Sequence, residues 1–422
     1  MKVLLVNTSE RRGGAAVACN RLMRALNKLD GVEANMLVRD RDTADPHVFS
    51  VNTSCYNRLL NYGRFCWERL KIFLCNGFSR KTLFAVSTAA TGINISTHQK
   101  LQEADIIHLH WINQGMLSLK GIRELLKSGK PIVWTMHDMW PCTAICHYSW
   151  ECMNFYEECG KCPFLNSDRQ NDLSNQVWKN KCYIKTSNIH LVTVSSWLAE
   201  QTRMSSLTKN LKVTVIPNVI DTSIFRPQEK MTIRRKYSFP IDKKIVLMGA
   251  VCLDNSIKGF QFLNEALNML SQKRNDLLLF LFGTIKNKDL LLKNLRVPYV
   301  SFGLLNDNRQ IAELYAIADV TVVPSYYETF GQTIIEAMAC GCPVVSFNNS
   351  GQTDIIDHKV NGYLAEYKNP DDLANGIQWV LDNEDSPILS YACIKKVFEN
   401  YTEEIIVQKY YSLYNQLLNA KE

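Results

Sequence analysis

The chain has 422 residues, more than one typical hydrophobic core accommodates, so we expect two domains. Hydrophobic residues make up 46% of it and charged residues 21%, which is typical of a globular protein and excludes a disordered chain. The formal net charge of +7 falls short of the charge on a nucleic-acid-binding domain, so no nucleic-acid partner is expected.

The N-terminal segment and the cysteines bear on the compartment. Met1 and Lys2 lead directly into an apolar segment that ends at Asn7, too short for the apolar region of a signal peptide. No run of about 18 apolar residues exists, so we expect no transmembrane helix. The 14 cysteines are then expected to stay reduced or to bind metal. Together these features predict a cytoplasmic protein, with association at a membrane surface left open.

The first half of the chain alternates short apolar segments with helical patterns. Strands are expected at residues 2–7, 33–38, 105–110, 131–136 and 190–195, and a helix at 13–29 follows the first of them. Such alternation predicts the α/β class with a doubly wound parallel sheet.

A second alternating series follows an expected interdomain turn at residues 213–221. Its strands are predicted at 244–248, 277–282, 319–323 and 343–347, and an amphipathic helix at 401–418 closes the chain. We therefore expect a first domain at 1–217, a second at 218–400 and a final helical segment at 401–422.

The most informative segment is residues 327–345, which follows a short apolar strand and opens a helix near Gly331. The free N–H groups of a helix N-terminus attract anions such as phosphate. Glu336 lies about one turn into this helix, where a carboxylate suits the hydroxyls of a ribose beside that phosphate. Glu328, before the helix, suits hydroxyls on the other side. The arrangement predicts a site for a nucleoside diphosphate that carries a polyhydroxylated group.

This segment resembles the E-x7-E signature of the retaining glycosyltransferases of family 4. The residues that follow the family's order and spacing are Glu328, Phe330, Gly331, Glu336, Ala337, Ala339, Gly341, Pro343 and Val344. The resemblance covers nearly the whole chain and is greatest to bacterial polysaccharide-assembly enzymes. It implies the GT-B fold, in which two Rossmann-like domains face a cleft and the last helix crosses back to the first domain. The alternative is an ordinary strand–loop–helix unit with two solvated glutamates.

The resemblance also implies a set of donor-binding residues. Lys258, before a glycine, corresponds to the family's pyrophosphate-binding lysine, although many members also have an arginine at the position of Ala250. The glycine pair after the first strand resembles the family's Gly-Gly loop, but it lacks the full G-x-G-x-x-G pattern of nicotinamide-binding proteins. The predicted nucleotide-sugar-binding residues are Gly13, Gly14, Lys258, Gly283, Phe330, Gly331, Gln332, Thr333 and Glu336.

The predicted catalytic residues are His137, Glu328 and Lys258. His137 follows a strand, where ligands bind in open α/β sheets, and the resemblance implies that a histidine there contacts the transferred sugar. The alternative is a structural His137 that stabilises its loop. His108 and His110 share one face of a strand, and either could be a core histidine with its hydrogen bonds satisfied. His110 and the three residues after it are expected to line the acceptor side.

These residues lead to one expected function and three alternatives. The resemblance implies transfer of a sugar, with retained anomeric configuration, from a UDP- or GDP-linked donor to a glycan or lipid-linked acceptor, in cell-surface polysaccharide biosynthesis. No catalytic metal is expected, because Lys258 and the helix amides would stabilise the leaving diphosphate. The alternatives are a nucleotide-sugar epimerase, a phosphorylase, and a non-catalytic zinc-bearing binding module.

Two further segments suggest binding. An insertion at about 140–165 contains Cys146, Cys152, Cys159 and Cys162, and its C-x2-C pair predicts a closed structural zinc site. Scattered buried thiols are the alternative. Residues 58–78 mix basic side chains with apolar and aromatic ones, which suits a surface resting on the inner membrane. The alternative there is a helix packed on its own domain.

Overall fold

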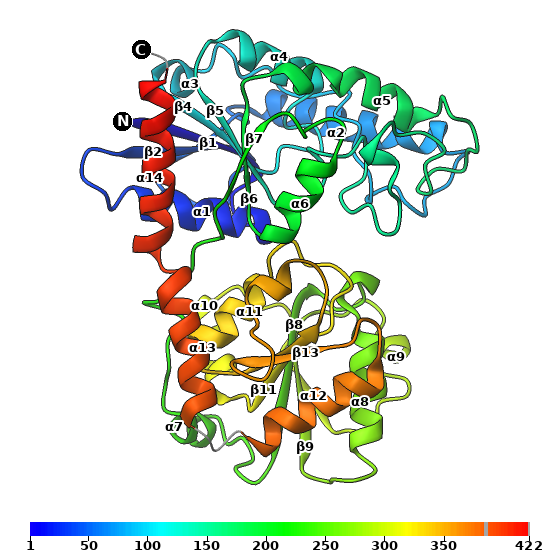
Figure 1. The fold of residues 1–422 in the computed structure, drawn as a ribbon, viewed down its shortest axis with the longest axis vertical. Coiled ribbons are helices and arrows are strands. Elements are labelled where there is room, and N and C mark those ends of the chain that lie inside the picture. The colour runs from blue at the N-terminus through cyan, green and yellow to red at the C-terminus, as the bar shows by residue number, and fades with distance from the viewer. Residues whose placement is uncertain (384–386, 421–422) are drawn as a thin grey trace. The chain divides into compact units, whose positions relative to one another are not determined.

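Two parallel β-sheets organise the chain in the computed structural model, which describes residues 1–383 and 387–420. The contacts divide the protein into two units, and each unit contains one of the sheets (Figure 1). Unit 1 comprises Met1–Pro217 and the chain from Val407 onward, and unit 2 comprises Asn218–Ile406. The prediction of an α/β protein with two parallel sheets is confirmed.

Within its described residues, unit 1 has a seven-stranded sheet in the order β3-β2-β1-β4-β5-β6-β7, with all pairs parallel. The strands are β1 (Lys2–Ser9), β2 (Glu33–Asp40), β3 (Val48–Ser50), β4 (Ile106–Leu109), β5 (Ile132–Met136), β6 (His190–Thr193) and β7 (Lys212–Val215). The helices are α1 (Gly14–Leu26), α2 (Cys55–Cys75), α3 (Gln99–Glu103), α4 (Leu119–Lys127), α5 (Leu173–Lys181) and α6 (Ser196–Met204). The strand order reverses between β1 and β4, where a doubly wound sheet binds its ligands.

Unit 2 repeats this plan with six strands in its described residues, in the order β10-β9-β8-β11-β12-β13. The strands are β8 (Lys244–Cys252), β9 (Leu277–Thr284), β10 (Tyr299–Ser301), β11 (Val320–Val323), β12 (Val344–Phe347) and β13 (Gly362–Ala365). The helices are α7 (Lys230–Lys236), α8 (Phe260–Leu270), α9 (Lys288–Leu291), α10 (Asn308–Ile317), α11 (Gln332–Ala339), α12 (Pro370–Asp382) and α13 (Pro387–Asn400). Its order reverses between β8 and β11, which is the second switch point.

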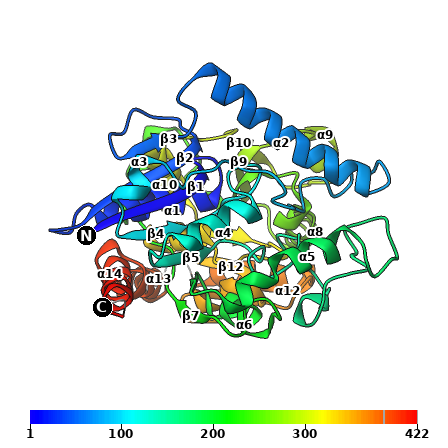
Figure 2. The same cartoon turned by 90° about the horizontal axis from the view of Figure 1, so that it is seen from above.

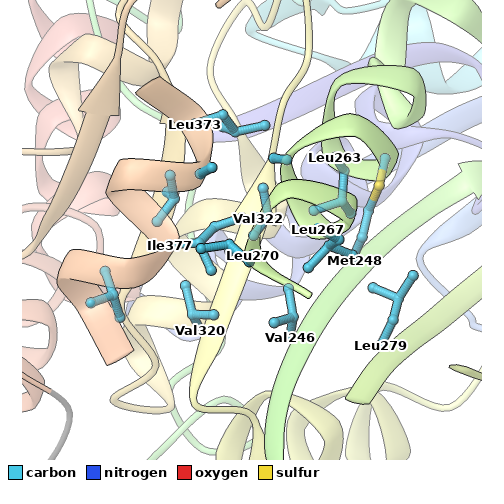
Figure 3. Close-up of a cluster of buried hydrophobic side chains, with 14 of the residues drawn as sticks. Val246, Met248, Leu263, Leu267, Leu270, Leu279, Val320, Val322, Leu373 and Ile377 are labelled. Atoms are coloured by element: carbon cyan, nitrogen blue, oxygen red, sulfur yellow. The ribbon is translucent and has the colours of Figure 1, made fainter. Parts of the chain in front are cut away.

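The core of unit 2 shows why these segments fold together. Apolar side chains of α8 and α12 meet over β8 and β11, as Leu263, Leu267 and Ile377 do in Figure 3. Removing such side chains from water stabilises the layer by about 25 cal/mol per Å² of buried apolar surface. Ala250 belongs to the same buried cluster, so the methyl group at this family arginine position packs in the core.

The last helix, α14 (Glu403–Asn419), begins in unit 2 and continues into unit 1. Its buried Tyr410 and Tyr414 contact polar groups on the strands of unit 1. The hydroxyl of Tyr410 lies 3.0 Å from Thr135 Oγ1, and that of Tyr414 lies 2.7 Å from His108 Nδ1. The C-terminal part of the chain is therefore built into the first unit by buried hydrogen bonds.

Several predicted boundaries were wrong. The first helix, expected at 13–29, is shorter at both ends: Gly13 adopts φ 92° and serves as the N-cap, so α1 starts at Gly14, and α1 ends at Leu26 with Asn27 as its C-cap. Residues 213–215, expected in a turn, belong to β7, which pairs with β6 and places Thr214 Oγ1 2.8 Å from His190 Nε2. The short strands β3, β10 and β13 were not predicted. β3 and β10 have three residues each and are mostly not buried, and β13 begins at a glycine, so none of them forms a distinct apolar run. No helix in the described ranges is both long and apolar enough to span a bilayer.

Candidate active site

In unit 2, two predicted catalytic residues meet at the switch point. Lys258 ends a 3₁₀ turn (Ser256–Lys258) after β8, and Glu328 lies in the loop after β11. Lys258 Nζ donates to Glu328 Oε1 over 2.6 Å. The side chains are 31% and 14% exposed, so the pair remains accessible to a ligand. Residues 70 positions apart in the sequence thus form one charged site.

The loop around Glu328 is fixed by its own hydrogen bonds. Ser325 Oγ donates to Glu328 Oε1 over 2.8 Å, while the Glu328 N–H donates to Ser350 Oγ over 3.1 Å. The Gly351 N–H donates to the Glu328 carbonyl over 2.7 Å. These bonds hold the carboxylate in place before any ligand arrives, which is the pre-organisation that charge stabilisation requires. Ser325 and Ser350 carry no sequence signal that distinguishes them from other loop serines.

Close backbone approach explains two glycines of this site. Gly283, at the end of β9, has φ 128°, and a Cβ there would lie 1.8 Å from the Ala250 carbonyl oxygen. Gly259, after Lys258, has φ 69°, and its Cβ would lie 1.9 Å from the Pro324 carbonyl oxygen. A side chain at Gly283 would therefore push the end of β9 away from β8, and one at Gly259 would push the segment after β8 away from the loop after β11.

Helix α11 starts beside the charged pair. Its N-cap, Gly331, has φ 111° and forms no side-chain cap, while Gln332 and Thr333 in the first turn are half-buried. Phe330 is buried and packs edge-to-face on Tyr401. The helix dipole and the N–H groups of the first turn suit an anion at this end.

Glu336 is the fifth residue of α11 and only 8% exposed. The pKa of the nearby Cys340 thiol is raised by burial first, then by Cys342 and by Glu336. A carboxylate is seldom this buried unless it is paired or hydrogen-bonded. Its place on α11, one turn from the N-terminus, agrees with the position expected from the sequence.

In unit 1, Gly13 and Gly14 leave open space at the start of α1. A Cβ on either residue would meet no atom within 4 Å. The end of β1, before this turn, is tied to the segment after β4, because Thr8 Oγ1 donates to the carbonyls of Trp111 and Asn113 over 3.0 and 2.9 Å. The switch point of unit 1 is therefore roomy and braced from both flanking strands.

His137 follows β5 and belongs to a short histidine array. Its Nε2 lies 2.9 Å from His110 Nδ1, and the two rings stack with their centroids 5.2 Å apart. Burial lowers the pKa of His137 to about 4, despite an opposing effect of Asp138. Burial, then His108 and His137, lower the pKa of His110. Both rings are therefore neutral near pH 7, when each can accept one hydrogen bond and donate another.

His108 is a core residue. Its two ring nitrogens lie 2.7 Å from the Tyr414 hydroxyl and 2.7 Å from Thr135 Oγ1, and burial lowers its pKa to about 3. The expectation that one of the two strand histidines is a satisfied core histidine is confirmed for His108.

The loop of His137 is supported by a network that sequence reasoning missed. Asp138 Oδ2 accepts hydrogen bonds from Trp111 Nε1 at 2.7 Å and His147 Nδ1 at 2.6 Å. Burial raises the pKa of Asp138, but His147 and the hydrogen bonds from Trp140 and Trp111 outweigh it, so the pKa lies below its usual value. No local spacing links His147 to Asp138, because the intervening chain loops out and returns.

Comparison with known sequences then decides the family. The family model described as Glycosyltransferase Family 4 matches residues 12–224, half of the chain, and that described as Glycosyl transferases group 1 matches residues 229–396. The chain belongs to glycosyltransferase family 4. The resemblance found in the E-x7-E segment is confirmed.

Two curated relatives illustrate the range of similarity. An uncharacterized glycosyltransferase of Methanocaldococcus jannaschii is 32% identical over 270 residues, which cover 61% of this chain and 66% of the relative. The N,N'-diacetylbacillosaminyl-diphospho-undecaprenol alpha-1,3-N-acetylgalactosaminyltransferase of Campylobacter jejuni is 33% identical over 182 residues, 42% of this chain and 46% of the relative. The chain thus spans about half to two thirds of the length of these relatives.

Solved structures share the fold along the whole chain. Sucrose-phosphate synthase from Thermosynechococcus elongatus has a TM-score of 0.72 at 20% identity and covers 99% of both chains. HepE from Anabaena, solved in complex with UDP and glucose, has a TM-score of 0.64 at 16% identity and covers 98% of this chain and 99% of HepE. These likenesses confirm the GT-B fold expected from the sequence.

Proposed function

We propose that this protein is a retaining glycosyltransferase, of the hexosyltransferase type, that moves a sugar from a nucleoside diphosphate donor to a hydroxyl of a glycan or lipid-linked acceptor. The observation that carries this proposal is the ion pair of Lys258 and Glu328 beside the N-terminus of α11. Membership of family 4 supports the reaction class. The solved complex of HepE with UDP and glucose supports a uridine diphosphate donor over a guanosine one.

Each residue has a role in this reaction. Lys258 and the first N–H groups of α11 stabilise the negative charge that develops on the leaving diphosphate. Glu336 binds the ribose hydroxyls, and Glu328 orients Lys258 and the sugar. Neutral His137 hydrogen-bonds a sugar hydroxyl without adding charge near the donor carbon.

The bond changes are balanced without a protein nucleophile. The bond from the anomeric carbon to the phosphate oxygen breaks, and a bond to the acceptor oxygen forms on the same face of the sugar. The acceptor proton passes to the leaving phosphate oxygen. The protein contributes positioning and charge stabilisation, and this scheme needs no catalytic metal.

A membrane-bound acceptor is supported by the outer face of α2. Seven exposed apolar side chains define this face: Tyr56, Leu59, Leu60, Tyr62, Trp67, Leu70 and Leu74. Figure 2 shows α2 along the outer edge of unit 1. Its inner side is fixed to unit 1, since Glu68 Oε1 accepts from the N–H groups of Thr88 and Ala89 over 2.8 Å each. The packing alternative therefore describes only one side of the helix.

The charges near the outer face suit an anionic bilayer. Arg58, Lys71, Arg80 and Lys81 lie on or just after α2, whereas the one acidic residue between positions 55 and 81, Glu68, is buried against Arg69 at 3.0 Å. Arg69 is buried with it and does not belong to the outer face, contrary to the expectation from sequence. Apolar residues beside cations are typical of surfaces that rest on anionic lipid. We propose that α2 docks at the cytoplasmic face of the inner membrane, where a lipid-linked acceptor for cell-surface polysaccharide is found. The Campylobacter relative, named for an undecaprenol-linked acceptor, supports this choice.

A panel of nucleotide sugars tests the proposal. The protein is heated with UDP- and GDP-linked sugars, and a bound donor should raise the melting temperature by mass action. Donors that stabilise the protein are then incubated with lipid-extracted or short glycan acceptors, and the anomeric configuration of the product is read by NMR.

Each rival function has its own outcome in this experiment. Conversion of the donor sugar without any acceptor would indicate an epimerase. Transfer that requires inorganic phosphate and a glycan, but no nucleotide, would indicate a phosphorylase. No stabilisation by any nucleotide would favour a non-catalytic module and overturn the proposal.

A further inference from the structure

The cysteine-rich insertion brings its four predicted ligands together around one cavity. Cys146, Cys152, Cys159 and Cys162 all line a cavity of about 20 Å³ in unit 1. A space of this size holds about one water molecule or one small ion. Cys142, the fifth cysteine of the segment, does not line it.

Contacts from other parts of unit 1 position the four cysteines. Cys146 forms an isolated antiparallel bridge with Val86. The Cys162 N–H donates to Asp172 Oδ2 over 2.8 Å, and Asn175 Nδ2 donates to the Cys159 carbonyl over 2.7 Å. The knuckle between Cys159 and Cys162 depends on Gly160, because a Cβ there would lie 2.4 Å from the Gln170 carbonyl oxygen. The segment is thus built around the cavity rather than loosely coiled.

Two backbone N–H groups are directed at the sulfurs. The N–H of Ala144 hydrogen-bonds to Cys159, and the N–H of Phe164 hydrogen-bonds to Cys162. Peptide N–H groups directed at sulfur are the outer contacts that a metal-bound thiolate uses.

A buried lysine next to the cysteines supplies a second, independent observation. Lys181, at the end of α5, is fully buried and donates to the carbonyls of Trp140 and Thr143 over 2.7 and 3.0 Å. No ion pair of Lys181 occurs among residues 1–383 and 387–420. Its ammonium also lies 3.2 Å from the centroid of the Trp140 ring, but neither this ring nor the carbonyls carry a full negative charge. Lysine is almost never fully buried unless it is paired with such a charge, because the ammonium loses its hydration. Burial lowers the pKa of Lys181 to about 7, and the groups that oppose this are Cys142, Cys146, Cys159 and Asp138.

We propose that Cys146, Cys152, Cys159 and Cys162 bind one Zn²⁺ as four thiolates, with Lys181 as the buried counter-charge. Binding converts four thiols and Zn²⁺ into a tetrathiolate complex of charge −2 and releases four protons to solvent. In the part of the chain that the structure describes, no three or more acidic, histidine or cysteine side chains stand ready to hold a metal. Zn²⁺ therefore has to draw the four sulfurs closer together as it binds, which couples metal binding to a local rearrangement of the insertion.

This zinc site is structural and not catalytic, because four protein ligands leave no open coordination position. It would nevertheless support the site around His137. Cys146 is followed directly by His147, whose Nδ1 lies 2.6 Å from Asp138 Oδ2, and Asp138 adjoins His137. This effect on catalysis rests on the proposed function, whereas metal binding itself does not.

Metal analysis of the full-length protein tests the proposal without any activity assay. The protein is purified without chelator, and its zinc content is measured by mass spectrometry of the elements. We expect about one zinc per chain, because a closed tetrathiolate site binds its metal tightly. The double variant Cys159→Ser/Cys162→Ser should lose this zinc, while Cys142→Ser, in the same segment but outside the cavity, should retain it.

A second measurement keeps the test decisive if the double variant does not fold. X-ray absorption of the wild-type zinc protein should show four sulfur neighbours at about 2.3 Å. Titration with a mercurial should release one zinc for every four thiols. Less than about a fifth of an equivalent of zinc, with the four thiols freely reactive in the native protein, would overturn the proposal. A disulfide among them in freshly purified protein, or zinc held by nitrogen and oxygen ligands, would overturn it too.

Discussion

In unit 2 an ion pair lies after the strands that flank the switch point, whereas in unit 1 two neutral imidazoles lie after β4 and β5. Lys258 and Glu328 stay partly exposed and charged at the first site. His110 is buried and His137 half-buried at the second, and removal from water keeps their pKa values low. The two units have the same sheet topology around the switch point, so the difference lies in the residues that follow the strands.

This difference in charge between the two sites agrees with the chemistry of glycosyl transfer. A leaving diphosphate is an anion and gains from a fixed cation at the end of a helix. A sugar ring and an acceptor hydroxyl are neutral and gain from groups that hydrogen-bond without attracting counter-ions. One fold thus serves a charged and an uncharged part of the substrates by changing a few loop residues. Changing the residues of one site at a time tests this division.

Lys258→Ala should have the largest effect, because it removes the cation of the charged site. We expect kcat to fall about 100- to 1000-fold, as when one pre-organised donor to a developing negative charge is lost. UDP affinity should fall as well. Lys273→Ala, an exposed lysine just after α8, is the matched control and should leave both constants unchanged. Normal kinetics in the Lys258 variant would remove this lysine from the phosphate site.

The neutral state of His137 should make the free energy of unfolding depend on pH. His137 has a pKa of about 4 when folded and about 6.5 when unfolded, so between these values the unfolded chain binds more protons. The free energy of unfolding therefore falls as the pH drops below about 6.5 and levels off below about 4. The shift corresponds to a contribution of about 3 kcal/mol.

Urea titrations at pH 7.5 and 4.5 measure this loss, and His137→Gln should reduce it by about that amount. The comparison uses the difference between the two pH values within each protein, so a constant cost of the substitution cancels. An unchanged difference in the variant would show that His137 is not the neutral group assigned here.

Glu336→Ala should weaken donor binding without a comparable loss of turnover at saturation. A charged acceptor for the ribose hydroxyls is worth about 1.5–3 kcal/mol, or roughly a 10- to 150-fold rise in the Kd of UDP. Calorimetric titration of UDP measures it, with uracil as the ligand that lacks the ribose. Unchanged affinity for UDP would contradict the assignment of Glu336.

Glu328→Gln should show the opposite pattern at the same site. The amide keeps the size of the side chain but loses the charge that orients Lys258, so we expect kcat to fall at least about tenfold while the Kd of UDP changes less. Steady-state kinetics beside calorimetry separate the two constants. A larger loss of UDP affinity than of kcat would assign Glu328 to nucleotide binding instead.

How much of this the sequence predicts depends on how local each signal is. The E-x7-E segment lies on one strand–loop–helix unit, so its pattern predicted where α11 begins and that Glu336 lies about one turn into it. The pairing of Lys258 with Glu328 joins two loops 70 residues apart and needs the parallel order of β8 and β11. The sequence placed Glu328 beside the expected donor by its position before α11, but it placed Lys258 there only through the family resemblance.

The hydrogen bonds that hold the loop of His137 could not be predicted from the local sequence, because they also join distant segments. Asp138 is adjacent in sequence, but its partners Trp111 and His147 come from the end of β4 and from the insertion. The short strand β7 was missed because all of its residues are at least partly exposed. Its sequence therefore shows no alternation of buried and exposed positions that would mark a strand. Hydrophobic periodicity predicts strands that have one buried and one exposed face. Hydrogen-bond networks between strands can be predicted only after the strands have been placed in the sheet.

The smallest effect is expected for membrane binding by the outer face of α2. This face belongs to unit 1, whose histidine site is neutral, but basic residues lie beside it. Flotation with vesicles of phosphatidylglycerol and phosphatidylcholine at low salt should recover the protein with the lipid. Lys71→Gln should weaken binding about fivefold, since each cation near an anionic surface contributes about 1 kcal/mol. Trp67→Glu should weaken vesicle binding further, because the substitution places a negative charge in the apolar face of α2. Leu290→Glu, at a leucine of unit 2 that is 71% exposed against 57% for Trp67, is the control. Added salt should reverse the effect of Lys71 more than that of Trp67, since salt screens charges but not apolar contacts. Failure of the unmodified protein to float with anionic vesicles would leave α2 as a helix that serves its own domain alone.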